Sequence, residues 1–259
     1  MLWPAMPADP RPPAGAGPDG PEASPLPQPG PALAGVIFDM DGVIVDSEPL
    51  SMSTLAEMAA ERGIHLEPAL LGELIGVSLE DVLDILATRL DPGLAAAGVD
   101  AGQLRRDYHE RYLPRLRAAA VPTPGLERLV RGLAASGVPV AIASSSTLPE
   151  IDAVVSALGL RTVLRAVASG EEVARHKPAP DVYLLAIERL GAGPGRVVAI
   201  EDSATGVAAA TAAGLVCVAV RTAATRGHDF GRAALVVGSL EELGVAILGR
   251  LVQDGPARD

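Results

Sequence analysis

The feature that most constrains the fold is an alternation of short apolar runs with helix-length segments, which begins at residue 125. The apolar runs have the length of strands and cover residues 138–144, 162–169, 196–202, 215–220 and 233–238. Helical patterns separate and follow them at 126–137, 148–159, 180–191, 204–214 and, last, near 240–252. Such an alternation is typical of βα units and a parallel sheet. With a further buried strand predicted at 34–38, the sequence predicts an α/β fold with a Rossmann-like parallel sheet.

Two other parts of the chain lack this alternation. Residues 48–121 show helical periodicity throughout, and we interpret them as an all-helical cap domain inserted after the first strand. The α/β core is then discontinuous and comprises residues 32–47 and 122–259. Residues 1–31 hold eleven of the 23 prolines and no periodic pattern. Such a segment cannot bury enough apolar surface to offset its ordering entropy, so we predict a disordered tail.

Charge and cysteine content limit the possible partners. The net charge of −11 at pH 7 disfavours nucleic acid as a partner. The longest small and apolar stretch, residues 206–220, is too short to span a bilayer, so we expect no membrane partner. The single cysteine, Cys217, allows no internal disulfide, which is consistent with a cytoplasmic location. We expect a cytoplasmic monomer that acts on a small molecule.

Polar side chains follow three of the predicted strands, at the edge where open parallel sheets bind ligands. These side chains are Asp39, Asp41, Ser144, Ser145, Ser146, Glu201 and Asp202. Carboxylates at two neighbouring strand ends suit a hard cation with oxygen ligands, namely Mg²⁺. Of two aspartates two positions apart, one can attack phosphorus and the other can move a proton.

Lys177, which precedes the predicted helix at 180–191, is the only lysine in a chain with twenty arginines. Arginine cannot replace lysine where a compact ammonium must act as a point charge in a crowded anionic site. Together with the acids and hydroxyls, Lys177 therefore predicts a phosphate-binding site.

Four segments of the sequence hold these polar residues: "DMDGVIVDSEPL" (39–50), "VAIASSS" (140–146), "HKPAPDVY" (176–183) and "AIEDSATG" (199–206). In this order they resemble the four motifs of the haloacid dehalogenase (HAD) superfamily of phosphatases. The helical insertion is similar to the cap of the β-phosphoglucomutase-like subgroup. The resemblance implies an Mg²⁺-dependent phosphomonoester hydrolase that acts on a small phosphorylated metabolite, such as a sugar phosphate, through an aspartyl-phosphate.

The resemblance also implies roles for individual residues. Asp39 would be the nucleophile and Asp41 the acid and base. Phosphate would bind to Ser144, Ser145 and Lys177, whereas Ser146 is interpreted as a loop hydroxyl. The metal ligands would be Asp39, the carbonyl of Asp41, Asp202 and Glu201, the last directly or through water. In the cap, Glu48, Gly76, Val77, Ser78 and Leu79 are expected to contact the substrate. His109 has no companion in the sequence and receives no role.

Two other functions use similar residues. A phosphosugar mutase of the β-phosphoglucomutase type shares the core and cap, but the resembling mutases carry a histidine where this chain has Ser51 and an arginine where it has Leu79. A non-enzymatic phospho-acceptor module would also place acids, a hydroxyl and a lysine around Mg²⁺. Such a module needs neither the second aspartate of the Asp39–Asp41 pair nor a cap, so we favour an enzyme.

Overall fold

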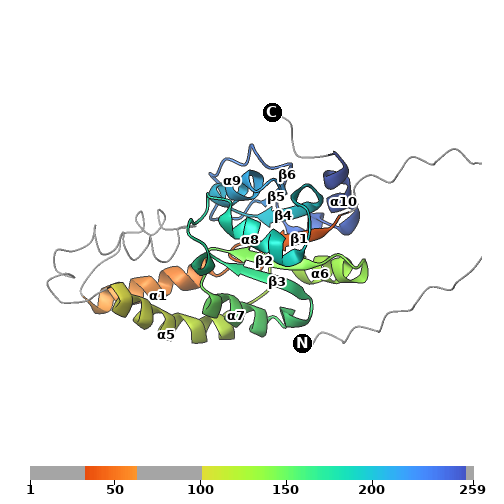
Figure 1. The fold of residues 1–259 in the computed structure, drawn as a ribbon. Coiled ribbons are helices and arrows are strands. Elements are labelled where there is room, and N and C mark those ends of the chain that lie inside the picture. The colour runs from red at the N-terminus through yellow and green to blue at the C-terminus, as the bar shows by residue number, and fades with distance from the viewer. Residues whose placement is uncertain (1–32, 63–100, 255–259) are drawn as a thin grey trace, which may run out of the picture.

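The computed structural model describes residues 33–62 and 101–254 of the chain (Figure 1). Its centre is a six-stranded sheet with the strand order β3-β2-β1-β4-β5-β6, in which every neighbouring pair is parallel. The strands are β1 (Gly35–Phe38), β2 (Val140–Ser144), β3 (Leu164–Ser169), β4 (Val197–Glu201), β5 (Val216–Val220) and β6 (Leu235–Val237). The predicted parallel α/β sheet is therefore confirmed. From β1 the chain adds β2 and β3 on one side and then β4, β5 and β6 on the other side. Parallel sheets bind ligands at the point where the order changes sides, which is here between β1 and β4.

The helices connect and cover these strands. They are α1 (Glu48–Glu61), α5 (Ala101–Ala119), α6 (Leu126–Ala135), α7 (Leu148–Ala157), α8 (Asp181–Leu190), α9 (Ala204–Ala212) and α10 (Val245–Asp254). The last predicted helix is divided in two. A 3₁₀ turn spans Leu240–Glu242, the backbone is extended at Leu243 with φ −96° and ψ 153°, and α10 starts only at Val245, after Gly244. The capping box of Ser239 and Glu242 stabilises the short turn separately from α10.

The two faces of the sheet pack against different side chains. Alternate residues of the strands, such as Phe38 and Ile142, join a cluster of valine, leucine and isoleucine with α6, α7 and α10. The intervening residues, such as Ala141 and Ala199, face α8 and α9 in a second cluster that is rich in alanine. Side chains of a strand alternate between faces, so one short strand contributes to both clusters.

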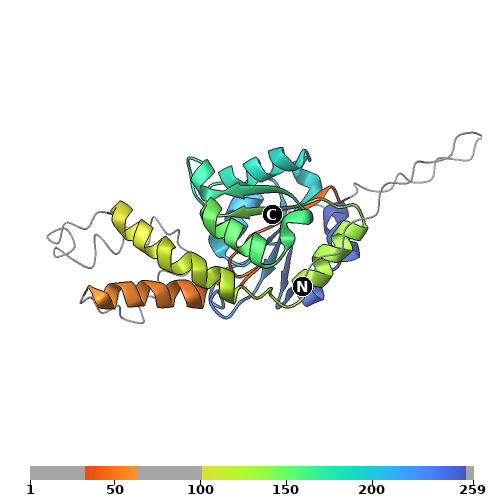
Figure 2. The same ribbon diagram turned by 90° about the horizontal axis from the view of Figure 1, so that it is seen from below.

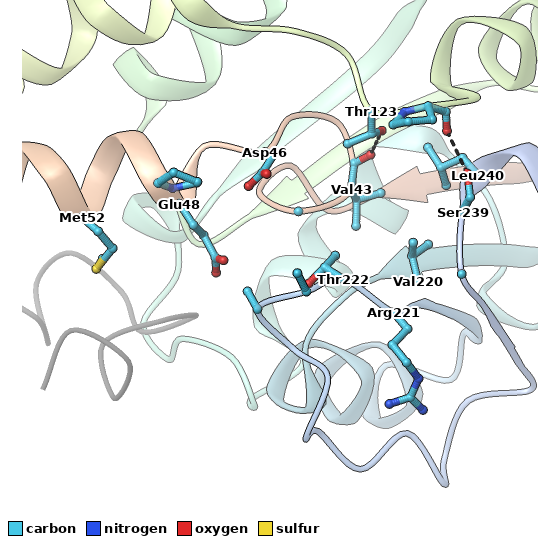
Figure 3. Close-up of a pocket in the computed structure, with 16 residues that line it drawn as sticks. Val43, Asp46, Glu48, Met52, Thr123, Val220, Arg221, Thr222, Ser239 and Leu240 are labelled. Carbon is cyan, nitrogen blue, oxygen red and sulfur yellow. Dashed lines mark hydrogen bonds between the residues drawn. The ribbon is translucent and has the colours of Figure 1, made fainter. Parts of the chain in front are cut away.

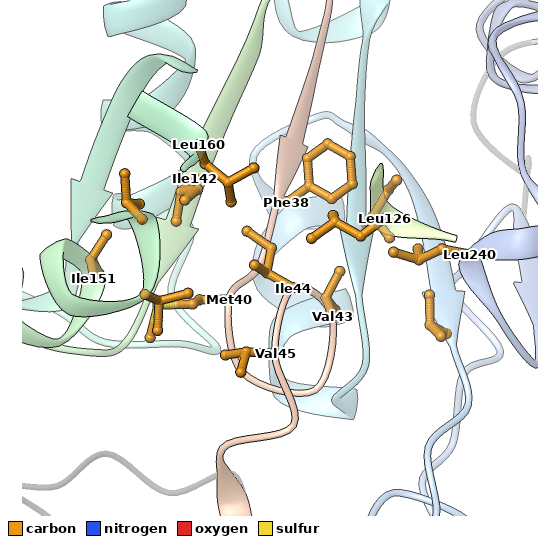
Figure 4. Packing of buried hydrophobic residues seen from close by; sticks show 14 of the residues in the cluster. Phe38, Met40, Val43, Ile44, Val45, Leu126, Ile142, Ile151, Leu160 and Leu240 are labelled. Carbon is orange, nitrogen blue, oxygen red and sulfur yellow. The ribbon is translucent and has the colours of Figure 1, made fainter. Parts of the chain in front are cut away.

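The chain directly after β1 is also buried. Figure 4 shows Met40, Val43, Ile44 and Val45 packed between the side of α7, marked by Ile151, and Leu240 near the C-terminal end of the chain. The turn that follows Asp39 is thus held by apolar packing on both sides. This burial fixes the direction in which the residues of that turn present their polar groups.

Helices α1 and α5 lie side by side and extend away from the sheet (Figures 1 and 2). Ion pairs join the two helices, with Arg115 Nη2 2.6 Å from Glu57 Oε2 and Arg111 Nη1 2.7 Å from Glu61 Oε1. Helix α1 begins at Glu48, and α5 ends at Ala119. The middle of the predicted cap (48–121) and the predicted tail (1–31) lie outside the described residues, so the division into a core and an inserted cap stays a prediction. In the part of the chain that is described, no helix has both the length and the apolar character that crossing a membrane requires.

Candidate active site

Three neighbouring strands bring the predicted site residues together at their carboxyl ends. Ser144 is the last residue of β2, and Glu201 is the last residue of β4. Asp39 directly follows β1, and its backbone N–H donates to the carbonyl of Ile200 at 2.9 Å. This bond continues the pairing of β1 with β4 by one residue and so fixes where the Asp39 side chain starts. The sheet therefore places residues far apart in sequence at one edge.

Lys177 reaches this edge from the loop before α8, and its side chain is only 7% exposed. Its ammonium nitrogen lies 2.6 Å from Asp39 Oδ1, 2.6 Å from Glu201 Oε1 and 3.1 Å from the carbonyl oxygen of Ala143. Three acceptors match the three protons of an ammonium group. Burial acts to lower the pKa of Lys177, but the two adjacent carboxylates outweigh it, and the pKa is raised. A broad guanidinium would not fit this arrangement.

Glu201 is fully buried and uses both carboxylate oxygens. Oε1 accepts from Lys177 and from the hydroxyl of Tyr183 at 2.6 Å, and Oε2 accepts from the backbone N–H of Asp202 at 3.1 Å. A Cβ at Gly206, in the first turn of α9, would lie 2.0 Å from this carboxylate. Glycine is therefore required there. Tyr183 is a fully buried residue of α8. Its hydrogen bond to Glu201 was not predicted from the sequence, although the third motif ends on this tyrosine.

Asp39, Glu201 and Asp202 form a buried group of three carboxylates whose ligand atoms lie within 4.8 Å of one another. Burial, partly offset by Lys177, raises the pKa of Asp39 to about 8. Burial, with the charges of Asp39 and Glu201 adding to it, raises the pKa of Asp202 to about 9. One ammonium does not balance three carboxylates, and a divalent cation with oxygen ligands would. The donor set therefore fits Mg²⁺.

Asp41 lies in the turn after β1, and hydroxyl groups hold both of its carboxylate oxygens. Ser47 donates to Oδ1, and Ser146 donates to Oδ2 at 2.6 Å. Burial raises the pKa of Asp41, and these two hydrogen bonds act against the rise. Gly42 follows with φ +76°, and a Cβ there would lie 2.1 Å from Asp202 Oδ2. The turn thus brings Asp41 and the carboxylate group together without a side chain between them.

The three serines after β2 differ in their surroundings. Ser144 is fully buried, and its hydroxyl accepts from the backbone N–H of Ser146 at 3.0 Å. Ser145 is half-buried, and its backbone lies so close to Gly170 that a Cβ on that glycine would be 2.8 Å from the Ser145 carbonyl oxygen. Ser146 contacts Asp41, which the interpretation of Ser146 as a loop hydroxyl did not foresee. The sequence holds no signal for this contact, because Ser146 is one of three consecutive serines.

A pocket of about 520 Å³ adjoins the site at the base of α1 (Figure 3). It is lined by both linkers to the predicted cap and by the loops after β5 and β6: Gly42, Val43, Asp46, Glu48, Pro49, Met52, Thr123, Pro124, Val220–Ala224 and Gly238–Leu240. Arg221 points away, because its guanidinium lies 5.0 Å from the centre of the Phe230 ring and donates to the Arg226 carbonyl at 3.1 Å. Glu48 points from α1 toward Thr222 on the opposite wall (Figure 3). The pocket is therefore acidic.

Of the five cap residues predicted to contact the substrate, Glu48 is the one that lies among the described residues. Its burial, and then the charges of Asp41 and Asp46, raise its pKa to about 7. Glu48 in turn contributes to the raised pKa of Asp202, so it lies within electrostatic reach of the carboxylate group. The predicted substrate loop, with Gly76, Val77, Ser78 and Leu79, lies outside the described residues.

Comparison with known proteins identifies the family of the chain. Residues 33–214 match the family model of the haloacid dehalogenase-like hydrolases. Protein CbbY of Rhodobacter capsulatus is 32% identical over 215 residues, which cover 78% of this chain and 91% of that protein. Fructose-1-phosphate phosphatase YqaB of Escherichia coli is 32% identical over 188 residues, which cover 73% of this chain and 96% of that protein.

A solved structure of a CbbY variant from Rhodobacter sphaeroides, in complex with xylulose 1,5-bisphosphate, matches this fold with a TM-score of 0.76 and 30% identity. The match covers 83% of this chain and 99% of that one. The chain therefore belongs to the haloacid dehalogenase-like hydrolase family and is an enzyme of the phosphoric monoester hydrolase class, as its four motifs predict.

Proposed function

We propose that this enzyme hydrolyses a sugar monophosphate in an Mg²⁺-dependent reaction, through an aspartyl-phosphate on Asp39. The observation that carries the proposal is the position of Asp39. Its carboxylate lies 2.6 Å from the buried Lys177 ammonium and beside two further buried carboxylates, at the carboxyl end of the central strand. A nucleophile, a fixed positive charge and a set of metal ligands thus meet at one point.

Asp39, Asp202 and Glu201 would hold the metal, together with the carbonyl of Asp41. Bound Mg²⁺ supplies positive charge that stabilises the oxygens of a transferring phosphoryl group. Both carboxylate oxygens of Glu201 already accept hydrogen bonds, from Lys177, Tyr183 and the backbone of Asp202, which favours a contact to the metal through water over a direct one. A second task of Glu201 is then to hold Lys177 beside Asp39.

The remaining roles follow from the contacts of each side chain. A carboxylate oxygen of Asp39 attacks phosphorus, and the bond from phosphorus to the ester oxygen breaks. Asp41 gives its proton to the departing alkoxide and later takes one from the water that cleaves the aspartyl-phosphate. We assign phosphate binding to the Ser144 hydroxyl, the Ser145 backbone and Lys177. The raised pKa of Asp41 suits an acid that must hold a proton before the ester bond breaks.

The substrate class rests on the relatives and on the pocket. YqaB is named a fructose-1-phosphate phosphatase, and the CbbY structure holds a phosphorylated pentulose. In this chain, Glu48 supplies a carboxyl group beside the site, and carboxyl groups accept hydrogen bonds from sugar hydroxyls. We therefore assign Glu48 to the non-transferring part of a sugar phosphate. The cytoplasmic location and the monomeric state remain predictions from the sequence.

One contact favours hydrolysis over phosphosugar mutation. Ser51 of α1 occupies the position where resembling mutases carry a histidine, and its hydroxyl lies 2.9 Å from the hydroxyl of Tyr108 of α5. The hydroxyl of Ser51 thus forms a hydrogen bond between α1 and α5. Unlike histidine, serine has no group that titrates near neutral pH. We expect release of inorganic phosphate and no conversion of β-glucose 1-phosphate to glucose 6-phosphate.

The test compares the parent enzyme with Asp39→Asn against a panel of sugar phosphates and p-nitrophenyl phosphate, with and without Mg²⁺. Asparagine keeps the shape of the side chain and removes its charge, so we expect turnover to fall about 10³-fold or more. Retention of several per cent of the activity by this variant would contradict the nucleophilic role. Isomerisation of β-glucose 1-phosphate that outpaces phosphate release would show a mutase instead.

A further inference from the structure

Glu150 is a buried carboxylate that the reaction described above does not use. It lies in the first turn of α7 and is 5% exposed. Its Oε2 accepts from the backbone N–H of Thr147 at 2.8 Å and from the Thr147 hydroxyl at 2.9 Å. These bonds close a capping box at the start of α7. Glu150 therefore fixes the residue that directly follows the serine loop at 144–146.

The other carboxylate oxygen of Glu150 faces helix α5. Glu150 Oε1 lies 3.5 Å from His109 Nε2 of α5, and their side chains are only 7% and 18% exposed. Helix α5 packs against α7 along this contact (Figures 1 and 2). A buried carboxylate is costly unless polar groups surround it, and the His109 ring nitrogen of α5 is a polar group that faces this oxygen. Glu150 is thus a point where polar side chains of α5 and of the start of α7 meet.

Covalent and hydrogen bonds link Thr147 to Asp41. Thr147 follows Ser146 in the chain, and the Ser146 hydroxyl donates to Asp41 Oδ2 at 2.6 Å. The backbone N–H of Ser146 is held in turn by the Ser144 hydroxyl at 3.0 Å. A shift of the Thr147 backbone would therefore move Ser146, and with it the orientation of the Asp41 carboxyl.

We propose that Glu150 and His109 are positioning residues that couple the placement of α5 to the orientation of Asp41. Glu150 accepts its hydrogen bonds from Thr147 and acts on Asp41 through Thr147 and Ser146, and its charge also contributes to the raised pKa of Asp41. A simple helix cap does not require this arrangement, because capping carboxylates serve equally well at exposed helix starts. The inference rests on the proposed function, since it takes Asp41 to be the acid that protonates the leaving group.

A comparison of leaving groups tests this coupling. A sugar alkoxide needs a proton as it departs, whereas p-nitrophenolate is stable without one. A misplaced acid should therefore slow the first step, formation of the aspartyl-phosphate, for sugar phosphates selectively, and kcat/KM reports this step without the later hydrolysis that both substrates share. General destabilisation should lower kcat/KM for both substrates alike. We expect Glu150→Gln to lower kcat/KM about tenfold for the sugar phosphate of the panel that the parent enzyme hydrolyses best. We expect it to change kcat/KM for p-nitrophenyl phosphate by less than about twofold.

His109→Gln should give the same selective loss, and the double variant should lose no more than the larger single effect, because both residues act on one contact. Asp152→Asn is the matched control. It lies on the same helix, and its ion pair with Arg161 is exposed, with side-chain exposures of 48% and 63%. We expect this control to leave the ratio of the two kcat/KM values unchanged.

The outcomes separate the inference from the function on which it rests. Asp41→Asn should lower kcat/KM for that sugar phosphate by about 10²-fold or more and kcat/KM for p-nitrophenyl phosphate far less, because only the sugar needs a proton on its leaving group. If Asp41→Asn shows this pattern and both Glu150→Gln and His109→Gln slow the two substrates equally or not at all, the coupling is refuted. If Asp41→Asn itself lacks the pattern, the acid role in the proposed function fails first, and the coupling is refuted with it.

Discussion

Tyr183→Phe is the sharpest test of how the buried part of the site is held. The change removes one oxygen, which donates to Glu201 Oε1 at 2.6 Å, and keeps a ring whose centre lies 5.0 Å from the Lys177 nitrogen. A hydrogen bond to a charged group contributes about 1.5–3 kcal/mol. Because Glu201 Oε1 still accepts from Lys177 in the variant, we expect the lower part of this range, about 1.5–2 kcal/mol.

The assay is thermal unfolding, since 1 kcal/mol shifts the Tm of a chain of this size by about 2–4 °C. We therefore expect a decrease of about 3–8 °C for Tyr183→Phe. Tyr108→Phe is the matched control, because it removes a hydroxyl that pairs with the neutral Ser51 hydroxyl at 2.9 Å. Its neutral bond should contribute less, about 0.5–1.5 kcal/mol. If Tyr183→Phe shifts the Tm no more than Tyr108→Phe does, the charged bond to Glu201 does not contribute as argued.

Two further predictions concern charge. Lys177→Arg should lower kcat about 10²-fold, because a guanidinium cannot meet the three acceptors of the ammonium; normal turnover in a steady-state assay would contradict this. Glu48 has a pKa raised from 4.5 to about 7, so the folded protein loses stability as the pH rises through this window. Glu48→Gln should remove that loss, about 1–2 kcal/mol after allowance for partial exposure, and Tm measured from pH 4 to 8 should show the parent falling relative to the variant.

The sequence predicted the sheet because buried parallel strands leave a direct signal. Runs such as 215–220 are apolar throughout, since both of their faces are covered, and helices of regular length separate them. The division of the last helix was not predicted, because Leu240 and Leu248 both continue an apolar helical pattern. Only the capping box at Ser239 and the extended backbone at Leu243 separate the two pieces.

The meeting of Asp39, Lys177 and Glu201 could be predicted because topology alone brings strand ends to one edge. The hydrogen-bond partner of each polar atom could not be predicted from the sequence. Tyr183 lies in the middle of an apolar helix face, where a tyrosine is usually core, and only the structure shows its hydroxyl on Glu201. Likewise, nothing in a run of three serines indicates that Ser146 is the one that reaches Asp41.

The contrast between the two faces of the sheet makes neighbouring residues vulnerable to opposite kinds of mutation. On the alanine-rich face, Ala141 and Ala199 have almost nothing to lose, and an added methyl group would push α8 or α9 outward at a cost of about 1–3 kcal/mol. On the other face, Ile142 is fully buried among large side chains, and truncation to alanine would leave a cavity that costs about 2–5 kcal/mol. Enlargement should therefore be the damaging change at Ala141 and Ala199, and truncation the damaging change at Ile142.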